Sequence, residues 1–260
     1  QGERTLSVIA SPVLESGQVT GAVVLTLDVT EREQREKLRR EFSANVSHEL
    51  KTPLTSISGF AELMSQGLVP SDKVREFSLD IQKECTRLTN LVEDIIDLTR
   101  LDAGGEDYVF ESCDLLRIAE NAVDSLETEA SGADVTLSLK GVSAPMQGVP
   151  QLLHSIVYNL CDNAIKYNMQ GGSVKISTVS EGGFSSVTVS DTGIGIAPEY
   201  QNRIFERFFR VDKSHSKSSG GTGLGLSIVK HAVQYHHGKI ELTSAPGNGT
   251  SITVSFPAIQ

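Results

Sequence analysis

The pattern of apolar and polar residues divides the chain into three parts. The first part contains two runs rich in Val, Ile, Leu and Thr, Leu6–Leu14 and Val19–Val29, separated by Ser16 and Gly17. Such runs around a Ser-Gly pair predict two strands joined as a hairpin. An isolated two-stranded sheet is only marginally stable. We therefore expect residues 1–30 to be the end of a larger sheet domain or to pack elsewhere.

A helical period follows from residue 31 to residue 103. The segment 31–40 is dense in charges of both signs, which favours an exposed helix. Apolar residues then recur three or four positions apart on either side of a break at Gly67 and Pro70. They are Leu38, Phe42, Val46, Leu50, Leu54, Ile57, Ala61 and Met64 before the break, and Val74, Phe77, Ile81, Cys85, Leu88, Val92 and Ile95 after it. This spacing predicts a helical hairpin whose second helix is capped by Ser71 or Asp72.

Residues 104–260 mix helical and strand-like segments. The helical pattern covers Leu115–Ala130, Gln151–Tyr167 and Leu224–Tyr235. The strand pattern covers Val135–Leu139, Ser173–Val179, Ser186–Ser190, Lys239–Ser244 and Thr250–Phe256. Glycine-rich turns between these segments favour antiparallel pairing. We therefore expect an α+β chain whose last part is an α/β sandwich, with one sheet against one layer of helices.

Composition narrows the classes of partner. The chain has 260 residues and a formal net charge of −10, which argues against nucleic acid as a main partner. Aromatic residues make up only 5% and Trp is absent, which speaks against a base-stacking surface. No apolar run approaches the roughly 18 residues of a membrane span, so we expect no direct membrane contact from this chain. The cysteines Cys85, Cys113 and Cys161 lack metal or disulfide spacing, which fits a reducing, cytoplasmic compartment.

One histidine lies on the polar side of the first predicted helix. At about 100° per residue, His48 falls about 200° from Val46, whereas the apolar stripe stays within about 80° of it. Thr52 follows one turn later on the same face, and Pro53 should bend the helix. The adjacent Glu49 offers a carboxylate that would fix the imidazole tautomer and make the other ring nitrogen more basic. A single exposed histidine is ordinarily just solvated, so these neighbours alone leave both interpretations open.

The predicted helix Gln151–Tyr167 carries residues suited to a nucleotide and its cation. Asn159 and Asn163 are one turn apart, and amide oxygens at that spacing can converge on Mg²⁺. Lys166 adds a charge for phosphate, and Tyr167 adds a flat face for a base. Polar residues four apart are also typical of an ordinary wet helix face.

Two glycine motifs follow. Asp191 begins the run DTGIG after a predicted strand, where Gly193 and Gly195 allow close backbone approach and the carboxylate can accept a bond from an exocyclic amine. The run GGTGLG at 220–225 opens a helix, so its N–H groups point at an anion. It lacks the GK[ST] of a Walker A loop and the preceding strand of a dinucleotide fingerprint. The polar run Asp212–Ser219 before it suits a lid over phosphates.

Together these motifs resemble one family. Residues 42–54, FSANVSHELKTPL, resemble the phospho-acceptor box of sensor histidine kinases. The order of Asn helix, DTGIG and glycine loop resembles the Bergerat ATP-binding fold. Residues 204–212 resemble the F box that distinguishes the kinases within that fold, with Phe209 where Tyr is common. The strands before residue 30 resemble the end of a PAS domain.

The resemblance implies three domains: a partial PAS-like segment at 1–30, a dimerisation and phosphotransfer hairpin at 31–103, and an ATP-binding domain at 104–260. It implies that His48 accepts the γ-phosphoryl group of ATP, that Glu49 assists as base, and that Thr52 positions water for dephosphorylating the partner. It further implies a homodimer with a four-helix bundle, a response regulator receiver domain as partner, and a parent protein anchored in the membrane.

Site roles in the ATP-binding domain are likewise implied by position. Asn159 and Asn163 would bind Mg²⁺, Lys166 phosphate, Tyr167 the adenine face, Asp191 the adenine amine and Arg210 the γ-phosphate, while Gly193, Gly195, Gly221, Thr222, Gly223, Leu224 and Gly225 would complete the ATP pocket. Gly104 and Gly105 are the expected hinge.

The rival interpretations are a catalytically silent ATP-binding interaction module and an ATPase that drives a clamp. The second gives no reason for His48 on an exposed face.

Overall fold

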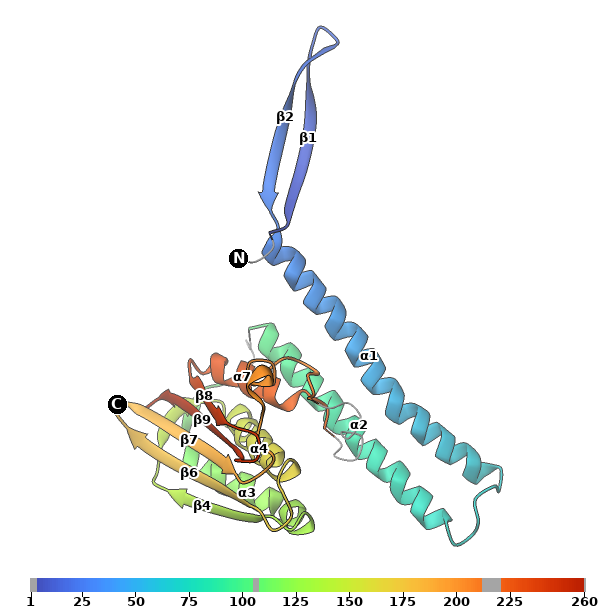
Figure 1. Ribbon diagram of the computed structural model, residues 1–260, viewed down its shortest axis with the longest axis vertical. Helices are drawn as coiled ribbons and strands as arrows, with labels where there is room; N and C mark the ends of the chain where they lie inside the picture. Colours follow the sequence, from blue (N-terminus) through green and yellow to red (C-terminus); the bar gives the residue numbers. More distant parts are fainter. Residues whose placement is uncertain (1–3, 105–107, 212–220, 260) are drawn as a thin grey trace.

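A computed structural model describes residues 4–104, 108–211 and 221–259. The chain runs from a β-hairpin through two long antiparallel helices into an α/β unit (Figure 1). The hairpin strands are β1 (Leu6–Glu15) and β2 (Gln18–Asp28), and the long helices are α1 (Thr30–Ser65) and α2 (Val74–Asp102). The expected α+β class with an N-terminal hairpin is confirmed.

The α/β unit follows α2. Its helices are α3 (Leu115–Gly132), α4 (Pro150–Lys166), α5 (Pro198–Gln201) and α7 (Gly225–Tyr235). Its strands are β3 (Glu111–Asp114), β4 (Thr136–Gly141), β5 (Pro145–Gly148), β6 (Ser173–Glu181), β7 (Phe184–Asp191), β8 (Lys239–Ser244) and β9 (Thr250–Pro257). The sequence pattern did not predict β3, β5 or α5, which have only four residues each and are too short to show a period.

Both faces of the β1–β2 ribbon are largely exposed to solvent. Its strands pair antiparallel, and every residue of β2 is exposed. The ribbon joins α1 through Asp28, whose Oδ1 accepts hydrogen bonds from the Thr30 backbone N–H at 3.0 Å and the Thr30 hydroxyl at 2.6 Å. These bonds replace a side-chain cap at the start of the helix.

The helical hairpin is amphipathic but only half covered. Among the described side chains of α1, Pro53 alone is buried, and it lies inside the helix as predicted. The expected cap of α2 by Ser71 or Asp72 is wrong. Residues 71–73 form a turn in which the Lys73 N–H donates to the Pro70 carbonyl at 2.9 Å, so α2 begins at Val74 without a side-chain cap.

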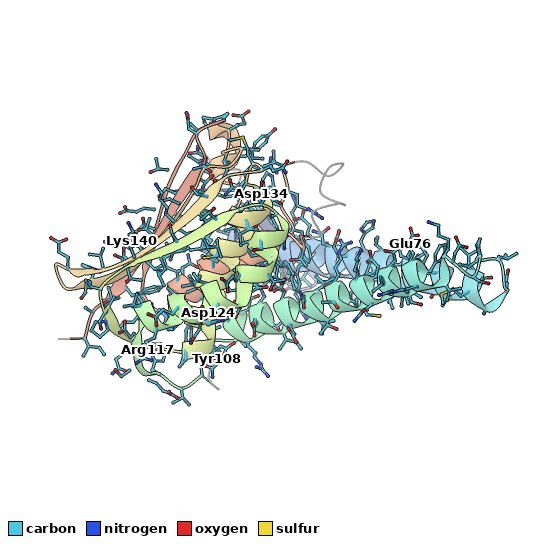
Figure 2. The ribbon with its side chains drawn as sticks, turned by 90° about the horizontal axis from the view of Figure 1, so that it is seen from below. Glu76, Tyr108, Arg117, Asp124, Asp134 and Lys140 are labelled. Atoms are coloured by element: carbon cyan, nitrogen blue, oxygen red, sulfur yellow. The ribbon has the colours of Figure 1, made fainter. Side chains whose placement is uncertain are left out.

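The main sheet has the strand order β4-β6-β7-β9-β8. The turns predicted antiparallel pairing, and three pairs are antiparallel, but β4 and β6 are parallel because β5 and α4 intervene between them. Helices α3, α4 and α7 cover one face, as Figure 2 shows from below. The other face pairs hydroxyl groups, with Thr188 and Thr253 2.9 Å apart and Ser190 and Ser251 2.7 Å apart.

Helix α7 lies between the sheet and α2. One side of α7 packs into the main core, whereas Leu224 and Ile228 form a second buried cluster with Leu91 and Leu98 of α2. Figure 2 shows the far end of the hairpin, at Glu76, projecting away from the α/β unit. The unit therefore rests on the C-terminal half of α2, and this contact places the glycine loop against the hairpin.

Candidate functional site

His48 points into solvent from α1. Its side chain is 80% exposed, and its Nδ1 lies 3.7 Å from Oε1 of Glu49, which is itself 24% exposed. That separation is too long for a hydrogen bond. One turn on, the exposed Thr52 donates its hydroxyl to the His48 carbonyl at 3.2 Å. The exposed face predicted for His48 and Thr52 is therefore present, with the half-buried Glu49 at its edge.

The two asparagines of α4 have their amide groups oriented by the helix. Asn159 Nδ2 donates to the Ser155 carbonyl at 2.9 Å, and Asn163 Nδ2 donates to the Asn159 carbonyl at 2.8 Å. With the nitrogen atoms used in this way, the amide oxygens are the atoms that each residue offers to a ligand. Carbonyl-type oxygens are what Mg²⁺ prefers. The pair therefore fits a cation.

The end of α4 meets the DTGIG run. The Ile194 N–H donates to the Tyr167 carbonyl at 3.1 Å, and a Cβ at Gly193 would overlap that same carbonyl. Lys166 Nζ pairs with Asp162 at 2.7 Å, so the lysine charge is held beside α4. Tyr167 is 42% exposed and is thus accessible to a flat ligand.

Asp191 lies at the end of strand β7, on the sheet side of the site. Its Oδ1 accepts bonds from the backbone N–H groups of Gly193 at 2.8 Å and Thr250 at 3.1 Å. Burial raises the pKa of this carboxyl, although both hydrogen bonds lower it. Gly195 has φ +69°, and a Cβ there would overlap the Ala245 carbonyl, so the loop tolerates only glycine at this position.

The glycine loop joins α4 to the F-box segment. A Cβ at Gly225 would overlap Oδ1 of Asn159, which brings the start of α7 onto the asparagine helix. Gly223 has φ +73° and its carbonyl accepts from the Phe208 N–H at 2.9 Å. Gly221 lies near the Tyr167 hydroxyl. Asn159, Asn163, Tyr167, Asp191 and the glycines thus converge from distant parts of the chain.

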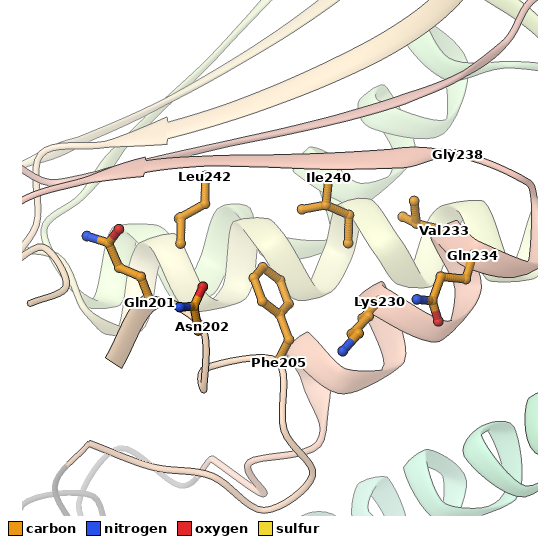
Figure 3. Close-up of a pocket in the computed structure, with 9 residues that line it drawn as sticks. All are labelled: Gln201, Asn202, Phe205, Lys230, Val233, Gln234, Gly238, Ile240 and Leu242. Atoms are coloured by element: carbon orange, nitrogen blue, oxygen red, sulfur yellow. The ribbon is translucent and has the colours of Figure 1, made fainter. Parts of the chain in front are cut away.

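Arg210 occupies a different surface. It is half-buried and, with Tyr200, Arg203 and Arg207, lines a hollow of about 360 Å³. A second hollow of about 400 Å³ lies between α5, α7 and the edge strand β8 (Figure 3). Its floor is apolar and none of the predicted ATP residues lines it. The expected lid Asp212–Ser219, Gly220 and the hinge residue Gly105 lie outside the described residues.

Sequence reasoning missed a contact between the glycine loop and α2. The Thr222 hydroxyl donates to Asp94 Oδ2 at 2.9 Å and accepts from the Leu224 N–H at 3.2 Å. Burial raises the pKa of Asp94 to about 6, opposed by the bond from Thr222. A signal did exist, because Asp94 adjoins the apolar stripe of Leu91, Ile95 and Leu98, where a carboxylate is unexpected.

A second missed contact also joins the α/β unit to the hairpin. Arg207 pairs with Asp102 at the end of α2 at 2.6 Å, and its guanidinium lies over the ring of Phe42 on α1 at 5.3 Å. Phe208 contacts the same ring, with the centroids 5.8 Å apart. His231 lies 3.2 Å from Arg207; burial first, and then this cation, lower the pKa of its imidazole. The F-box segment is therefore part of the docking surface.

Comparison with known proteins agrees with this geometry. Residues 38–104 match the model of the His Kinase A (phospho-acceptor) domain, and residues 148–260 match that of the histidine kinase-, DNA gyrase B- and HSP90-like ATPases. The fold is that of solved histidine kinases: AdeS of Acinetobacter baumannii has a TM-score of 0.68 at 24% identity, covering 82% of this chain and 98% of that one. Histidine kinase ThkA, solved in complex with response regulator protein TrrA, has a TM-score of 0.67 at 24% identity, covering 100% and 77%.

These matches define a phospho-acceptor hairpin joined to an ATPase unit. The sensor-like histidine kinase SenX3 of Mycolicibacterium smegmatis is 40% identical over 237 residues, which are 91% of this chain and 62% of that protein. The chain belongs to the sensor histidine kinases of two-component systems. It spans about three fifths of the length of SenX3. Among the described residues, no helix is long and apolar enough to cross a membrane.

Proposed function

We propose that the chain phosphorylates its own His48 from ATP and passes the phosphoryl group to an aspartate of a response regulator receiver domain. The observation that supports this most directly is the outward imidazole of His48 beside Glu49, on a chain that also carries an ATPase unit. The rival interpretation, a silent ATP-binding module, gives no reason for an exposed histidine beside a carboxylate. The domain limits at 30 and 103 stay predictions of the same proposal.

The phosphoryl transfer requires positioning more than covalent chemistry. The Nε2 lone pair of neutral His48 would form the N–P bond while the bond from the γ-phosphorus to the bridging oxygen breaks and ADP leaves. Nδ1 would carry the ring proton, and Glu49 would accept it as the ring becomes cationic. Asn159 and Asn163 would hold Mg²⁺, which supplies charge neutralisation at the phosphates when bound. Lys166 would add positive charge at the phosphates, and Arg210 would do so after the F-box segment moves, because in the docked arrangement it lines a separate hollow.

The docked arrangement does not bring the glycine loop to His48. The loop meets α2 at Asp94, whereas the contacts of Glu49 across the hairpin are at Arg87. Seven residues of helix separate these levels, about 10 Å along the axis. Transfer therefore requires the α/β unit to move along the hairpin. Gly104, with φ +94° at the junction and no neighbour within 4 Å of a Cβ, suits the expected hinge.

The proposal also covers the oligomeric state, the reverse reaction, the partner and the compartment. The half-covered hairpin would pair with a second copy as a four-helix bundle, because members of its apolar stripes stay exposed, including Leu54 at 50% and Val92 at 41%. Thr52 beside His48 would position water for dephosphorylating the regulator. ThkA was solved in complex with a response regulator, which supports a partner of that class. Because ATP and such regulators are cytoplasmic, the catalytic part would act there, below a membrane anchor in the parent protein.

A labelling experiment tests the central step. The protein is incubated with Mg²⁺ and γ-labelled ATP, and the bound label is tested for acid lability and alkali stability, the signature of a phosphoramidate. We expect labelling in the wild type and none in His48→Ala. Unchanged labelling in His48→Ala would reject the assignment of His48, and no labelling of the wild type would favour the silent module.

The phosphatase role of Thr52 has its own test. Thr52→Ala should leave autophosphorylation within about twofold, because its hydroxyl bonds the helix carbonyl rather than the imidazole. It should slow dephosphorylation of the phosphorylated receiver domain by about tenfold. Serine at this position, which keeps the hydroxyl, is the matched control. Equal loss of both activities in Thr52→Ala would contradict a water-positioning role.

A further inference from the structure

Arg87 on α2 lies between two carboxylates, one from each helix of the hairpin. Its Nη2 is 3.7 Å from Oε2 of Glu49 on α1, and its Nη1 is 3.9 Å from Oε2 of Glu84 on α2. All three side chains are largely covered, at 20%, 24% and 27% exposure. Oε2 of Glu84 is buried and has no hydrogen-bond partner among the described residues. A buried oxygen without such a partner is costly and requires an explanation.

The cluster reaches the imidazole through Glu49. Oε1 of this carboxylate is 3.7 Å from His48 Nδ1, while its Oε2 faces Arg87, so the two oxygens of one carboxylate face two different groups. None of the three contacts is as short as a hydrogen bond. The Glu49 carboxylate therefore has room to move closer either to His48 or to Arg87. With a neutral imidazole it holds two negative charges and one positive charge.

We propose that Arg87 is a positioning residue for Glu49, and that Glu84 keeps Arg87 from neutralising Glu49 completely. The inference rests on the proposed phosphorylation of His48. For Nε2 to attack phosphorus, the ring proton must sit on Nδ1, and Glu49 must be held where it can accept that proton. Arg87 holds Glu49 from the opposite side. Glu84 shares Arg87, so the cluster retains one net negative charge to stabilise the ring as it becomes cationic.

The charges around Glu49 come from both helices of the hairpin. His48 faces it on α1, and Arg87, shared with Glu84, faces it on α2. The neighbouring Leu50 packs against the apolar cluster that Leu91 and Leu98 of α2 form with Leu224 and Ile228 of the α/β unit, so the α/β unit adds apolar side chains rather than charges there. Changes of charge at Arg87 and Glu84 should therefore act on His48 with opposite signs.

The pH dependence of autophosphorylation tests this sign. The acid limb of the rate profile reports loss of the neutral imidazole. Arg87→Gln removes a positive charge and should shift this limb to higher pH by a few tenths of a unit, with a rate about tenfold lower at its optimum and an unchanged KM for ATP. Glu84→Gln removes a negative charge and should shift the limb to lower pH by a similar amount. Lys83→Gln is the matched control, because Lys83 lies on the same helix but is 79% exposed, and it should shift nothing.

The ring tautomer gives a readout that involves no ATP. In protein labelled with ¹⁵N at histidine, the two nitrogen shifts of His48 should report mainly the Nδ1–H tautomer in the wild type and a mixture in Arg87→Gln. Arg87→Lys, which keeps the charge but not the fork, should restore part of the wild-type tautomer ratio. A group that only stabilises the hairpin would change the melting temperature without changing this ratio.

The outcomes distinguish the role of Arg87 from the proposed phosphorylation of His48 on which it rests. A wild type that takes no label at His48 removes the proposed function. A labelled wild type whose acid limb and tautomer ratio are the same in Arg87→Gln and Glu84→Gln overturns only the role of Arg87. Shifts of the same sign in the two variants overturn it as well. If Arg87→Gln does not fold, Glu84→Gln still decides, because a limb that stays in place or moves to higher pH contradicts the inference.

Discussion

The α1–α2 hairpin and the α/β unit are both built from amphipathic helices, but they cover the apolar faces to different extents. In the α/β unit, α4 buries eight side chains, among them Leu152, Ile156 and Leu160, against the sheet and its neighbours. In the hairpin, the longer α1 buries only Pro53 among its described side chains. The α/β unit has found its packing partners within the chain, whereas the hairpin has an apolar face left over.

The difference matches what each region is proposed to do. A nucleotide pocket needs fixed backbone, and the α/β unit provides it with glycines whose Cβ positions are filled by neighbouring atoms, as at Gly195 and Gly225. A histidine that receives a phosphoryl group from ATP and then passes it to a second protein must be accessible to both. His48 meets this requirement, because its side chain is 80% exposed. The same substitution should therefore have opposite effects in the two regions.

The largest contrast is expected for glycine to alanine. Gly195→Ala places a Cβ onto the Ala245 carbonyl at a φ of +69°, and should cost about 3 kcal/mol or more and abolish nucleotide binding. Gly59→Ala in the interior of α1 meets nothing within 4 Å and should stabilise that helix by about 1 kcal/mol. Thermal unfolding and nucleotide titration measure both effects. Equal melting temperatures for the two variants would contradict the comparison.

Oligomeric state gives the next contrast. Leu54 on α1 is 50% exposed and Val142 in the α/β unit is 58% exposed, so exposure alone does not separate them. Leu54→Glu should convert a dimer to a monomer, because it places a charge in the face proposed to pair with a second copy. Val142→Glu should leave the dimer intact. Light scattering over a range of concentrations distinguishes the two, and a dimer that survives Leu54→Glu would show that the pairing face lies elsewhere.

The sequence predicts most of the elements in both regions, but for different reasons. Strands such as β6 and β9 alternate apolar and polar residues, so their pattern alone locates them. The position of His48 follows from helix geometry, since a residue about 200° from the stripe can only face outward. The four-residue strands β3 and β5 are too short to show any period, and the Pro70–Lys73 turn replaced the side-chain cap expected at α2.

The docking of the two regions was beyond sequence reasoning. Thr222 and Asp94 are 128 positions apart, and no local pattern indicates that one will meet the other. Asp94 beside the stripe of Leu91 and Leu98 signals a covered surface but not what covers it. Arg87 is similar: helical spacing places it near Glu84, but only the packing of α1 on α2 brings it to Glu49.

Acid should strengthen the contact between the regions through Asp94. Its pKa is about 6 when docked, against 3.8 ordinarily, so the docked state binds the proton more tightly. Docking is therefore fully favoured below about pH 4 and weakens as pH rises through 6, by at most about 3 kcal/mol. Asp94→Asn should remove this dependence and raise the docked population at pH 7.5. Paired spin labels on α2 and β7 measure it, and an interdomain distance that is already the same at pH 5 and 7.5 in the wild type would contradict the role of Asp94.

The smallest expected effect has the opposite sign and lies inside the α/β unit. His236 is 3% exposed; its Nε2 accepts from the Val149 N–H at 2.9 Å, and its Nδ1 lies 2.7 Å from the Ala232 carbonyl. Both nitrogens are thus used by a neutral ring, and burial lowers the pKa of the imidazole below its ordinary 6.5. The unfolded chain binds the proton more readily, so the stability of the unit is complete above pH 6.5 and falls as the pH drops below it.

His236→Gln keeps an acceptor for Val149 and a donor for Ala232 without a titrating group. It should remove at most about 2 kcal/mol of the loss in stability between pH 7 and pH 5, the full linkage of one group with an ordinary pKa of 6.5, at the cost of some stability at neutral pH. Urea unfolding of the α/β unit at the two pH values measures this change. Asp94 predicts that acid strengthens the interdomain contact, and His236 predicts that acid destabilises the α/β unit. If acid weakened both, the predicted difference between the two regions would be contradicted.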